Sequence, residues 1–496
     1  MGYMKVLFLP VLLCIGTTVF AQENAWFKLY SGPGYDRGEG IVQLDSDSSF
    51  YITGSSSSWG ENQSAYLLHL DQQGNYLWSN AYGGSEIDMG KRILAKNNFL
   101  YLIGMSNSFL SKPDLDIYIV KLNMDGSIVW QRNFPLQGWQ FVNDAAWKTD
   151  TSFVLVGQTK LREDGVNPGF YFELNIDGDS IQFKEWGGLG ESAGHSVVVL
   201  GDTCVAYSGD IYSAEINASI GVVFLEDYMG NLYWSDTLNE LFVSSSILDL
   251  HEGVNKLHAV GYRAADALDE DEIFINYLPS DGSIINQSIA INNQSSKRIE
   301  EVVAFVDANG AQKIAIGMEN YSFAQPNRLE DILIANFNAN GLYWLNESRT
   351  IEFENKDEVG QVILTLDSSY IVVGTNKTQG LEDFTFNGGE HIFVFKPGNA
   401  INFPLTDNNL DLSNLNTLVG VQNPLGSHLE IYPNPCTTML HINMSYACTG
   451  HMYDMMGSLI LTIELEAGMN TLYLDNVNKG VYFIRVEDNQ YRIIKQ

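Results

Sequence analysis

The sequence has few cysteines and few basic residues. Only 4 of its 496 residues are cysteine, which excludes a fold held together mainly by disulfides. Its 27 lysines and arginines stand against 60 aspartates and glutamates, so the net charge is −33. A chain of this charge repels nucleic acid and anionic membranes, so neither is expected as a partner. The acidic excess suits a soluble protein, or one that binds cations or basic partners.

Long apolar runs are also scarce, and the clearest one lies at the start of the chain. Residues 1–21 carry Lys5, the apolar stretch VLFLPVLLCIG and the ending VFA, which together are typical of a secretory signal peptide. Leu13 precedes Cys14, where a lipoprotein signal has a small residue, so we do not expect acylation. No later run approaches the length of a membrane helix, and no transmembrane segment is predicted.

Glycine is abundant, with 45 residues, and its spacing reveals a repeat. A glycine ends the turn after an apolar strand seven times, and the first five of these glycines are 52 residues apart. The later steps of 59 and 57 residues are what loop insertions would produce. Seven units of this length predict a β-propeller. The glycines are Gly74, Gly126, Gly178, Gly230, Gly282, Gly341 and Gly398.

Each unit is predicted to form four strands. In the first unit, GIVQL from Gly40 is apolar enough to be the innermost strand, and SFYITG alternates as a second strand that ends at Gly54. The stretches AYLLHL and YLWSNAYGG supply the third and fourth strands. The same layout recurs three times, with 14 residues between the first glycine and the glycine, or Ser208, that ends the second strand. These recurrences begin at Gly90, Gly194 and Gly360.

The two ends of the repeat region predict how the ring closes. Residues 26–32, WFKLYSG, resemble the fourth strand of a unit, whereas the seventh unit stops after its third strand, HIFVFKPG, at residues 391–398. Pairing these two segments would complete the last blade and remove two exposed sheet edges. We therefore expect an all-β fold, a seven-bladed β-propeller over residues 22–399 that is closed by its N-terminal strand.

The longer connections all fall at one end of the predicted blades, where we expect a binding face. They carry aromatic residues and carboxylates, a combination that often holds sugars, and clustered oxygens also suit calcium. Another interpretation is that Asp116 and Asp331 only begin their strands and that residues 269–272, DEDE, form a solvated loop. The candidate binding residues are Trp59, Asp114, Asp116, Tyr262, Asp269, Asp271, Tyr321, Asp331, Asp383 and Phe384.

No catalytic residue is predicted. Residues 190–194 match G-x-S-x-G, but a nucleophile elbow needs a helix after the serine, and the stretch that follows Ser192 has the pattern of a strand. His251 and His258 have no third zinc ligand at a matched spacing. No metal or cofactor is identified apart from the possible calcium. Acids from several blades can still converge on a central channel, so a hydrolase or lyase remains an alternative.

The repeat pattern ends near residue 399, and a separate module follows. Residues 400–427 are rich in Asn, Leu and turn formers, which predicts a linker. Residues 428–496 contain seven short strands separated by turns, which predicts a small, Ig-like antiparallel β-sandwich. Cys436 and Cys448 in this module can pair, because an exported protein meets oxidising conditions.

Four motifs in this module occur in a recognisable order. They are IYPNP at 431–435, YDMMG at 453–457, NKGVYFIRV at 478–486 and RIIK at 492–495. Together they resemble the C-terminal sorting domain of type IX secretion, type A, of the Bacteroidetes. Cys436 stands where that family usually has a small residue. By this resemblance, the sorting signal is carried by Pro433, Asn434, Pro435, Asp454, Gly457, Gly480, Val481, Tyr482 and Lys495.

The resemblance implies a route and a set of partners. Such cargo crosses the inner membrane by its signal peptide, folds in the periplasm and passes the outer membrane through the type IX translocon, whose sorting machinery recognises the tail. The expected location is the outer-membrane surface or the extracellular space. The propeller half is similar to repeats in secreted proteins of the same bacteria, which implies no activity.

These observations favour a non-enzymatic module that binds a glycan or a surface protein through the long-loop face. Two alternatives remain open at this point. One is a secreted, glycan-active hydrolase or lyase with acids at the channel, and the other is a structural adhesin subunit.

Overall fold

The computed structural model describes much of the chain between residues 26 and 396 and, separately, of residues 430–495. The predicted signal peptide at 1–21 and the linker at 400–427 lie outside the described residues. Every regular element that is described is a β-strand, and these residues include no helix long and apolar enough to cross a membrane. The described ranges are 26–30, 34–58, 62–109, 114–162, 164–187, 190–201, 203–238, 244–266, 269–290, 295–306, 312–322, 331–338, 343–351, 357–367, 369–376, 390–396, 430–432, 438–444, 447–454, 459–466, 468–474, 477, 479–486 and 489–495.

Between residues 26 and 396, the described strands form seven four-stranded antiparallel sheets. Six of them follow chain order. These are β2 (Asp36–Gln43), β3 (Phe50–Ser56), β4 (Ser64–Leu70) and β5 (Tyr76–Tyr82); β6 (Asp88–Lys96), β7 (Phe99–Ser106), β8 (Asp116–Asn123) and β9 (Ile128–Phe134); β10 (Trp139–Trp147), β11 (Ser152–Lys160), β13 (Gly169–Asn175) and β14 (Ser180–Trp186); β16 (Ala193–Leu200), β17 (Cys204–Ser213), β18 (Ala218–Asp227) and β19 (Leu232–Thr237); β20 (Ser244–Gly253), β21 (Lys256–Asp266), β22 (Asp269–Tyr277) and β23 (Ile284–Ala290); and β24 (Ser295–Val306), β25 (Gln312–Ser322), β26 (Asp331–Asn338) and β27 (Tyr343–Ile351).

The seventh sheet joins the two ends of this region. Its order is β1 (Trp26–Tyr30), β30 (His391–Lys396), β29 (Tyr370–Asn376) and β28 (Asp357–Leu364). Strand β1 runs antiparallel to β30, with Trp26 opposite Lys396 and Tyr30 opposite Ile392. The pairing predicted between these two segments is therefore present. A two-stranded parallel ribbon of β12 (Val166–Asn167) and β15 (Gly190–Glu191) links the third and fourth sheets.

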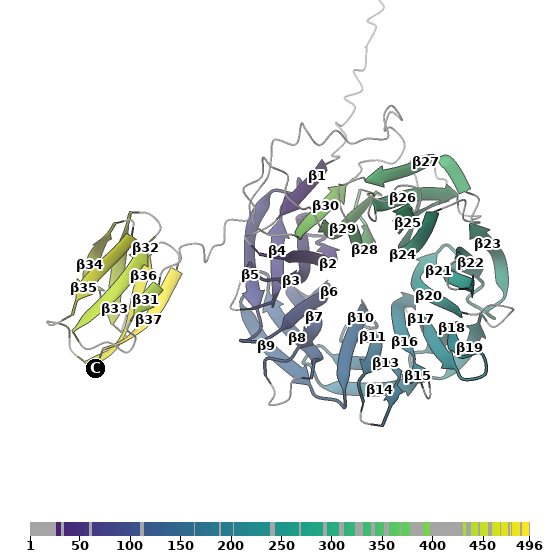
Figure 1. Ribbon diagram of the computed structural model, residues 1–496, viewed down its shortest axis with the longest axis horizontal. Helices are drawn as coiled ribbons and strands as arrows, with labels where there is room; N and C mark the ends of the chain where they lie inside the picture. The colour runs from purple at the N-terminus through teal and green to yellow at the C-terminus, as the bar shows by residue number, and fades with distance from the viewer. Residues whose placement is uncertain are drawn as a thin grey trace, which may run out of the picture.

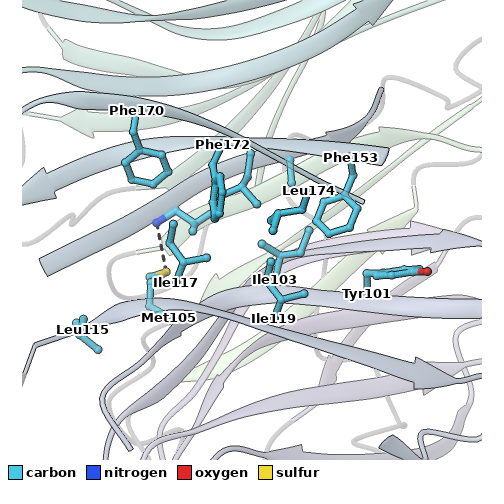
Figure 2. Close-up of a cluster of buried hydrophobic side chains, with 13 residues drawn as sticks. Tyr101, Ile103, Met105, Leu115, Ile117, Ile119, Phe153, Phe170, Phe172 and Leu174 are labelled. Carbon is cyan, nitrogen blue, oxygen red and sulfur yellow. Dashed lines mark hydrogen bonds between the residues drawn. The ribbon is translucent and has the colours of Figure 1, made fainter. Parts of the chain in front are cut away.

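The first strand of each of the six sheets in chain order, and β28 of the seventh sheet, lie toward a common centre (Figure 1). These innermost strands contact one another in sequence, and the last of them, β28, contacts the first, β2. Apolar side chains fill the space between neighbouring sheets. Figure 2 shows such a core between the second and third sheets, where Ile117 lies near Phe172 and Ile103 near Leu174.

The turn glycines of the repeat have a clear physical role. The five that are described have φ between +71° and +83°, a conformation that other residues adopt only with strain. Four of them also pack against a tryptophan of the preceding outer strand, for example Gly126 against Trp78 and Gly74 against Trp26 of β1. The tryptophans lie at the repeat spacing, as the glycines do.

The glycine in the second strand of each unit does not end that strand, contrary to the prediction. Strand β3 continues past Gly54 to Ser56, and a Cβ at Gly54 would lie 1.8 Å from the Arg37 carbonyl oxygen. The glycine is needed because the innermost strand approaches closely at this point. In the fourth sheet this position belongs to Gly209, whose Cβ would lie 1.9 Å from the Ala193 oxygen, and not to Ser208.

The described part of the C-terminal module contains the seven predicted strands. One sheet has the order β31 (Glu430–Tyr432), β32 (Met439–Met444) and β35 (Gly468–Tyr473). The other has the order β34 (Leu459–Leu465), β33 (Cys448–Asp454), β36 (Gly480–Val486) and β37 (Asn489–Lys495). Buried side chains from both sheets form one core, which includes Leu440, Ile442, Met452 and Ile484. Cys436, the proposed partner of Cys448, lies outside the described residues.

Candidate functional site

Each innermost strand carries a β-bulge at the same place, and the bulge turns the next side chain toward the centre of the ring. The pairing register skips one residue in each of these strands. We call the residue after each bulge a hub residue. The hub residues are Gly40, Arg92, Asp144, Ser196, Asp249, Glu301 and Gln361.

Arg92 joins strands from opposite parts of the ring. Its Nε lies 2.9 Å from Asp144 Oδ1 of β10, and its Nη2 lies 2.8 Å from Glu301 Oε1 of β24. Its Nη1 donates to the carbonyl oxygens of Glu39 in β2, at 3.0 Å, and of Gly360 in β28, at 3.2 Å. Because these bonds involve a buried charge, they are among the stronger ones a protein can form.

Several other hub side chains bind the backbone of the next sheet in a repeated pattern. Asp144 Oδ2 accepts the Val197 N–H at 2.9 Å, and Asp249 Oδ2 accepts the Val302 N–H at 2.7 Å. Gln361 Oε1 accepts the Ile41 N–H at 2.8 Å, so the same contact also joins the last sheet to the first. In each case the donor is the residue that follows the next hub residue. Ser196 fills the space between the two aspartates, 2.6 Å from Asp249 Oδ1 and 3.2 Å from Asp144 Oδ2.

The hub buries three carboxyl groups beside one guanidinium. Lys91 adds no net charge, because it pairs with Glu39 at 2.7 Å. Burial raises the pKa of Asp249 well above its usual value, and the nearby Glu301 and Asp144 raise it further. Burial also raises the pKa of Glu301 to about 7, although Arg92 acts in the opposite direction. The hub therefore keeps a proton at neutral pH, which reduces the charge that must be buried.

A carboxyl group with a pKa near 7 is what general acid catalysis requires, but the hub has little capacity left for a substrate. Both oxygens of Asp144 and both oxygens of Asp249 already accept hydrogen bonds from the protein. The Arg92 side chain is only 7% exposed. The hub thus has the bonding pattern of a structural clasp.

The long-loop face shows a different arrangement, in which polar groups anchor loops that display apolar tips. Asp36 binds the hydroxyls of Ser56 and Ser58, and Ser57 exchanges hydrogen bonds with Tyr35. Tyr35 itself is 62% exposed. The loop is therefore fixed while its aromatic tip remains accessible.

The same arrangement recurs one unit later. Asp88 Oδ2 accepts hydrogen bonds from the Ser108 hydroxyl and the Gly84 N–H, each at 2.8 Å, and burial raises its pKa. Ile87, which is 40% exposed, pairs with Asn107 through two hydrogen bonds. Phe109 is 41% exposed and stacks on Tyr118 at 5.3 Å. We call the exposed tips of these loops, Tyr35, Ile87 and Phe109, the loop-tip platform.

The predicted binding residues take several different positions. Asp116 is buried at the start of β8, where its Oδ1 accepts the Leu136 N–H at 3.2 Å, as the alternative interpretation expected. Asp114 is half-buried just before it. Neither belongs to the loop-tip platform, which sequence reasoning missed as a set.

Five other candidates lie in strands and not in loops. Tyr262 is half-buried in β21, and Asp269 and Asp271 belong to β22, so residues 269–272 are part of a hairpin and do not form the solvated loop of the alternative interpretation. Tyr321 lies in β25, and Asp331 begins β26. Trp59, Asp383 and Phe384 lie outside the described residues.

Neither the G-x-S-x-G pattern around Ser192 nor the pair His251 and His258 has the surroundings of a catalytic or zinc site. Ser192 is buried, its hydroxyl accepts the Tyr212 N–H at 3.0 Å, and β16 follows it. His251 and His258 face each other across β20 and β21, and burial lowers the pKa of each to about 4. Within the described part of the chain, no group of three or more Asp, Glu, His or Cys side chains could hold a metal ion. Calcium binding by the candidate loop residues stays a prediction.

Three of the four sorting motifs lie on the neighbouring strands β33, β36 and β37, whereas the first motif begins in β31 of the other sheet. Asp454 of β33 lies opposite Tyr482 of β36, and Gly480 lies opposite Lys495 of β37. Tyr482 is buried in the core of the module. Val481 lies between Gly480 and Tyr482 on β36. The other predicted sorting residues, Pro433, Asn434, Pro435 and Gly457, lie outside the described residues.

Comparison with known families decides what this module is. The model of the secretion system C-terminal sorting domain matches residues 430–496. These residues are a type IX sorting domain. The domain marks the protein for export to the cell surface or the extracellular space, and it implies an interaction with the type IX secretion machinery.

The region before the sorting domain is similar in fold to β-propellers of solved structure. The WD40 domain of Pan2 from Neurospora crassa shares 8% identity over 75% of this chain and 91% of that chain, with a TM-score of 0.45. The β-propeller domain of the Trilobed protease from Pyrococcus furiosus shares 10% identity over 78% of this chain and 99% of that chain, with a TM-score of 0.40. Likenesses of this strength say nothing about activity. No curated protein matches the sequence.

Proposed function

We propose that this protein is a seven-bladed β-propeller, closed by β1, that is exported by type IX secretion and binds a glycan or a surface protein without catalysis. The closed ring is supported by contacts that repeat across the junction of the first and last sheets. The Asp36 N–H donates to Glu390 O at 3.1 Å, as the Asp88 N–H donates to Gln63 O at 2.8 Å one unit later. Tyr30 likewise donates to Gly74 O as Tyr82 donates to Gly126 O.

The observation that carries the binding role is the loop-tip platform. Its exposed aromatic and apolar side chains stand on loops that are fixed by buried carboxylates, and a pre-organised surface of this kind loses little entropy when it binds. Aromatic rings are also the groups that most often dominate binding energy at such surfaces. The hub carboxylates Asp144 and Asp249, in contrast, already accept hydrogen bonds from the protein.

The binding role is tested on a glycan array and by calorimetry with the purified chain. The double variant Y35A/F109A should lose affinity by about tenfold or more, because aromatic anchors contribute most to binding. V129A is the control, since Val129 is similarly exposed but lies on the outer strand β9. Binding that Y35A/F109A leaves unchanged would contradict this site. Retention of whole cells without any free sugar would favour a protein ligand.

A hydrolase or lyase is the second candidate, because the raised pKa of Glu301 is one that a general acid needs. This function predicts released reducing ends or unsaturated sugars that disappear in E301Q. Turnover of a bound glycan by the unmodified chain, lost in E301Q, would replace the binding role with the enzymatic one.

A further inference from the structure

The two sheets of the sorting domain turn different side chains away from their shared core. In β32 and β35, Leu440, Ile442 and Leu472 pack inward. Because side chains alternate along a strand, the residues between them face outward. The outward residues whose side chains are described are Met439, His441, Met469, Thr471 and Tyr473.

Three of these five described side chains are large and apolar. Tyr473 is 66% exposed and Met469 is 55% exposed, and Met439 lies directly opposite Tyr473 in the register. A solvated sheet face normally alternates apolar residues inside with polar residues outside. Large exposed apolar groups on one face therefore point to a partner.

The outer face of the other sheet provides the contrast. Its described outward side chains include Thr449, His451, Thr462, Glu464 and Arg485. Thr449 and Glu464 form a hydrogen bond of 3.1 Å across two strands. Ile460 is an exposed apolar residue of the same face. The outward side chains that are described on this face are thus mostly polar.

Among the described strands, β35 lies at the end of its sheet, where it is well placed to receive a partner. Asn470 fixes the turn before it by donating to Glu466 O at 2.8 Å and Gly468 O at 3.0 Å and by accepting the Glu466 N–H at 2.9 Å. The start of the strand is thus held in one conformation. An ordered edge strand can also take up an additional strand through its backbone.

We propose that the outer face of β32 and β35, with Met439, Met469 and Tyr473, is the surface through which the type IX sorting machinery binds the folded domain. A tag that is recognised in its folded state must present its recognition groups on its own surface. Tyrosine and methionine are enriched, and charged residues depleted, in the centres of protein interfaces. The partner surface should accordingly be an apolar groove or sheet edge that accepts a methionine and a tyrosine side chain.

Export of the full-length chain from a bacterium with type IX secretion tests this surface. M469S/Y473S should reduce the surface and extracellular fraction by about tenfold or more, with accumulation in the periplasm, because it removes the central contacts of the interface. I460S is the matched control, since it replaces an exposed apolar residue of the other sheet, and it should be exported normally. Normal export of M469S/Y473S, or an equal defect in I460S, would overturn the proposal.

Site-specific crosslinking separates a binding defect from misfolding. A photoreactive phenylalanine derivative in place of Tyr473 should form an adduct with a component of the type IX machinery, identified by mass spectrometry, whereas the same probe in place of Thr462 should not. An adduct between two copies of this chain, or no adduct at position 473, would overturn the proposal. The purified M469S/Y473S protein should unfold within a few degrees of the unmodified chain, because both side chains lie outside the core.

Discussion

Arg92 has the most connections of the hub residues, and its contacts explain why the innermost strands tolerate charge. One guanidinium binds two carboxylates and two carbonyl oxygens, and these come from four strands other than its own. Removing one member of a buried ionic cluster leaves its partners charged and unpaired, which costs more than the cluster itself contributes.

Replacing Arg92 by methionine should therefore be severe. We expect R92M to lower the free energy of unfolding by about 3–5 kcal/mol, because Asp144 and Glu301 lose their counter-charge. Urea unfolding of the purified chain measures this. R92K, which keeps the charge but not the planar fork, should lie between R92M and the unmodified protein. A loss under about 1 kcal/mol in R92M, as for an exposed ion pair, would contradict the role of the hub.

The raised pKa of Glu301 predicts how stability depends on pH. The value in the fold is about 7, above the ordinary value of 4.5, so the folded state holds this proton more tightly than the unfolded state does. The contribution of this proton to the free energy of unfolding is complete below pH 4.5. It declines as the pH rises toward 7 and is absent above pH 7.

Thermal unfolding between pH 5 and pH 8 checks this dependence. The melting temperature should fall across this range, and in E301Q the fall should be smaller by several degrees, because an amide cannot ionise. An identical pH profile in E301Q and the unmodified chain would show that Glu301 does not hold the proton.

For single residues, the sequence predicted the spacing of the hub residues better than the direction in which their side chains point. The 52-residue period already relates Arg92, Asp144 and Ser196, as it relates the turn glycines. Whether these side chains meet at the centre depends on the bulge beside each of them, and a bulge leaves no reliable mark in the sequence. A search for polar residues at the repeat spacing within the innermost strands would have found them.

Among the strands, β1 shows most clearly how comparison with the other repeat units predicts the position of a strand in its sheet. It pairs with β30 as β5 pairs with β4, although it lies at the other end of the chain. Its Trp26 packs on Gly74 as Trp78 packs on Gly126. Strand β1 is therefore the fourth strand of the last sheet in its contacts as well as in its sequence.

This equivalence predicts equal effects from two distant substitutions. Tyr30→Phe and Tyr82→Phe each remove a buried hydrogen bond to a turn glycine, of 2.6 Å and 2.8 Å respectively. Each should cost about 1–2 kcal/mol in urea unfolding, because the glycine oxygen is left without its donor. If β1 were only loosely attached, Tyr30→Phe would cost much less than Tyr82→Phe.

Loop lengths were predicted less well than strand identity. The stretch from Tyr262 to Glu272 is rich in acids, which favours a loop, yet β21 and β22 extend through most of it. Pairing with a neighbouring strand stabilises such a hairpin whatever its local composition. The alternating and apolar segments, in contrast, were assigned correctly because burial determines them.

For the whole molecule, export depends on the sorting domain. Deleting residues 430–496 should trap the propeller in the periplasm, because the type IX machinery then has no domain to recognise. Cell fractionation and protease accessibility of intact cells measure this. Delivery of the truncated chain to the surface at the normal level would contradict the assignment of the route.

The position of β1 also sets an order of events. Its partners in β30 follow it by 362 to 370 residues, so the last sheet cannot acquire its outer strand until almost the whole propeller has been synthesised. Pairings between such distant segments are slow, because a long loop must close before they form. The sorting domain is the part of the chain that arrives after this point. The sorting domain can therefore fold only after every strand of the propeller has been made. This order reduces the chance that an incomplete propeller is exported.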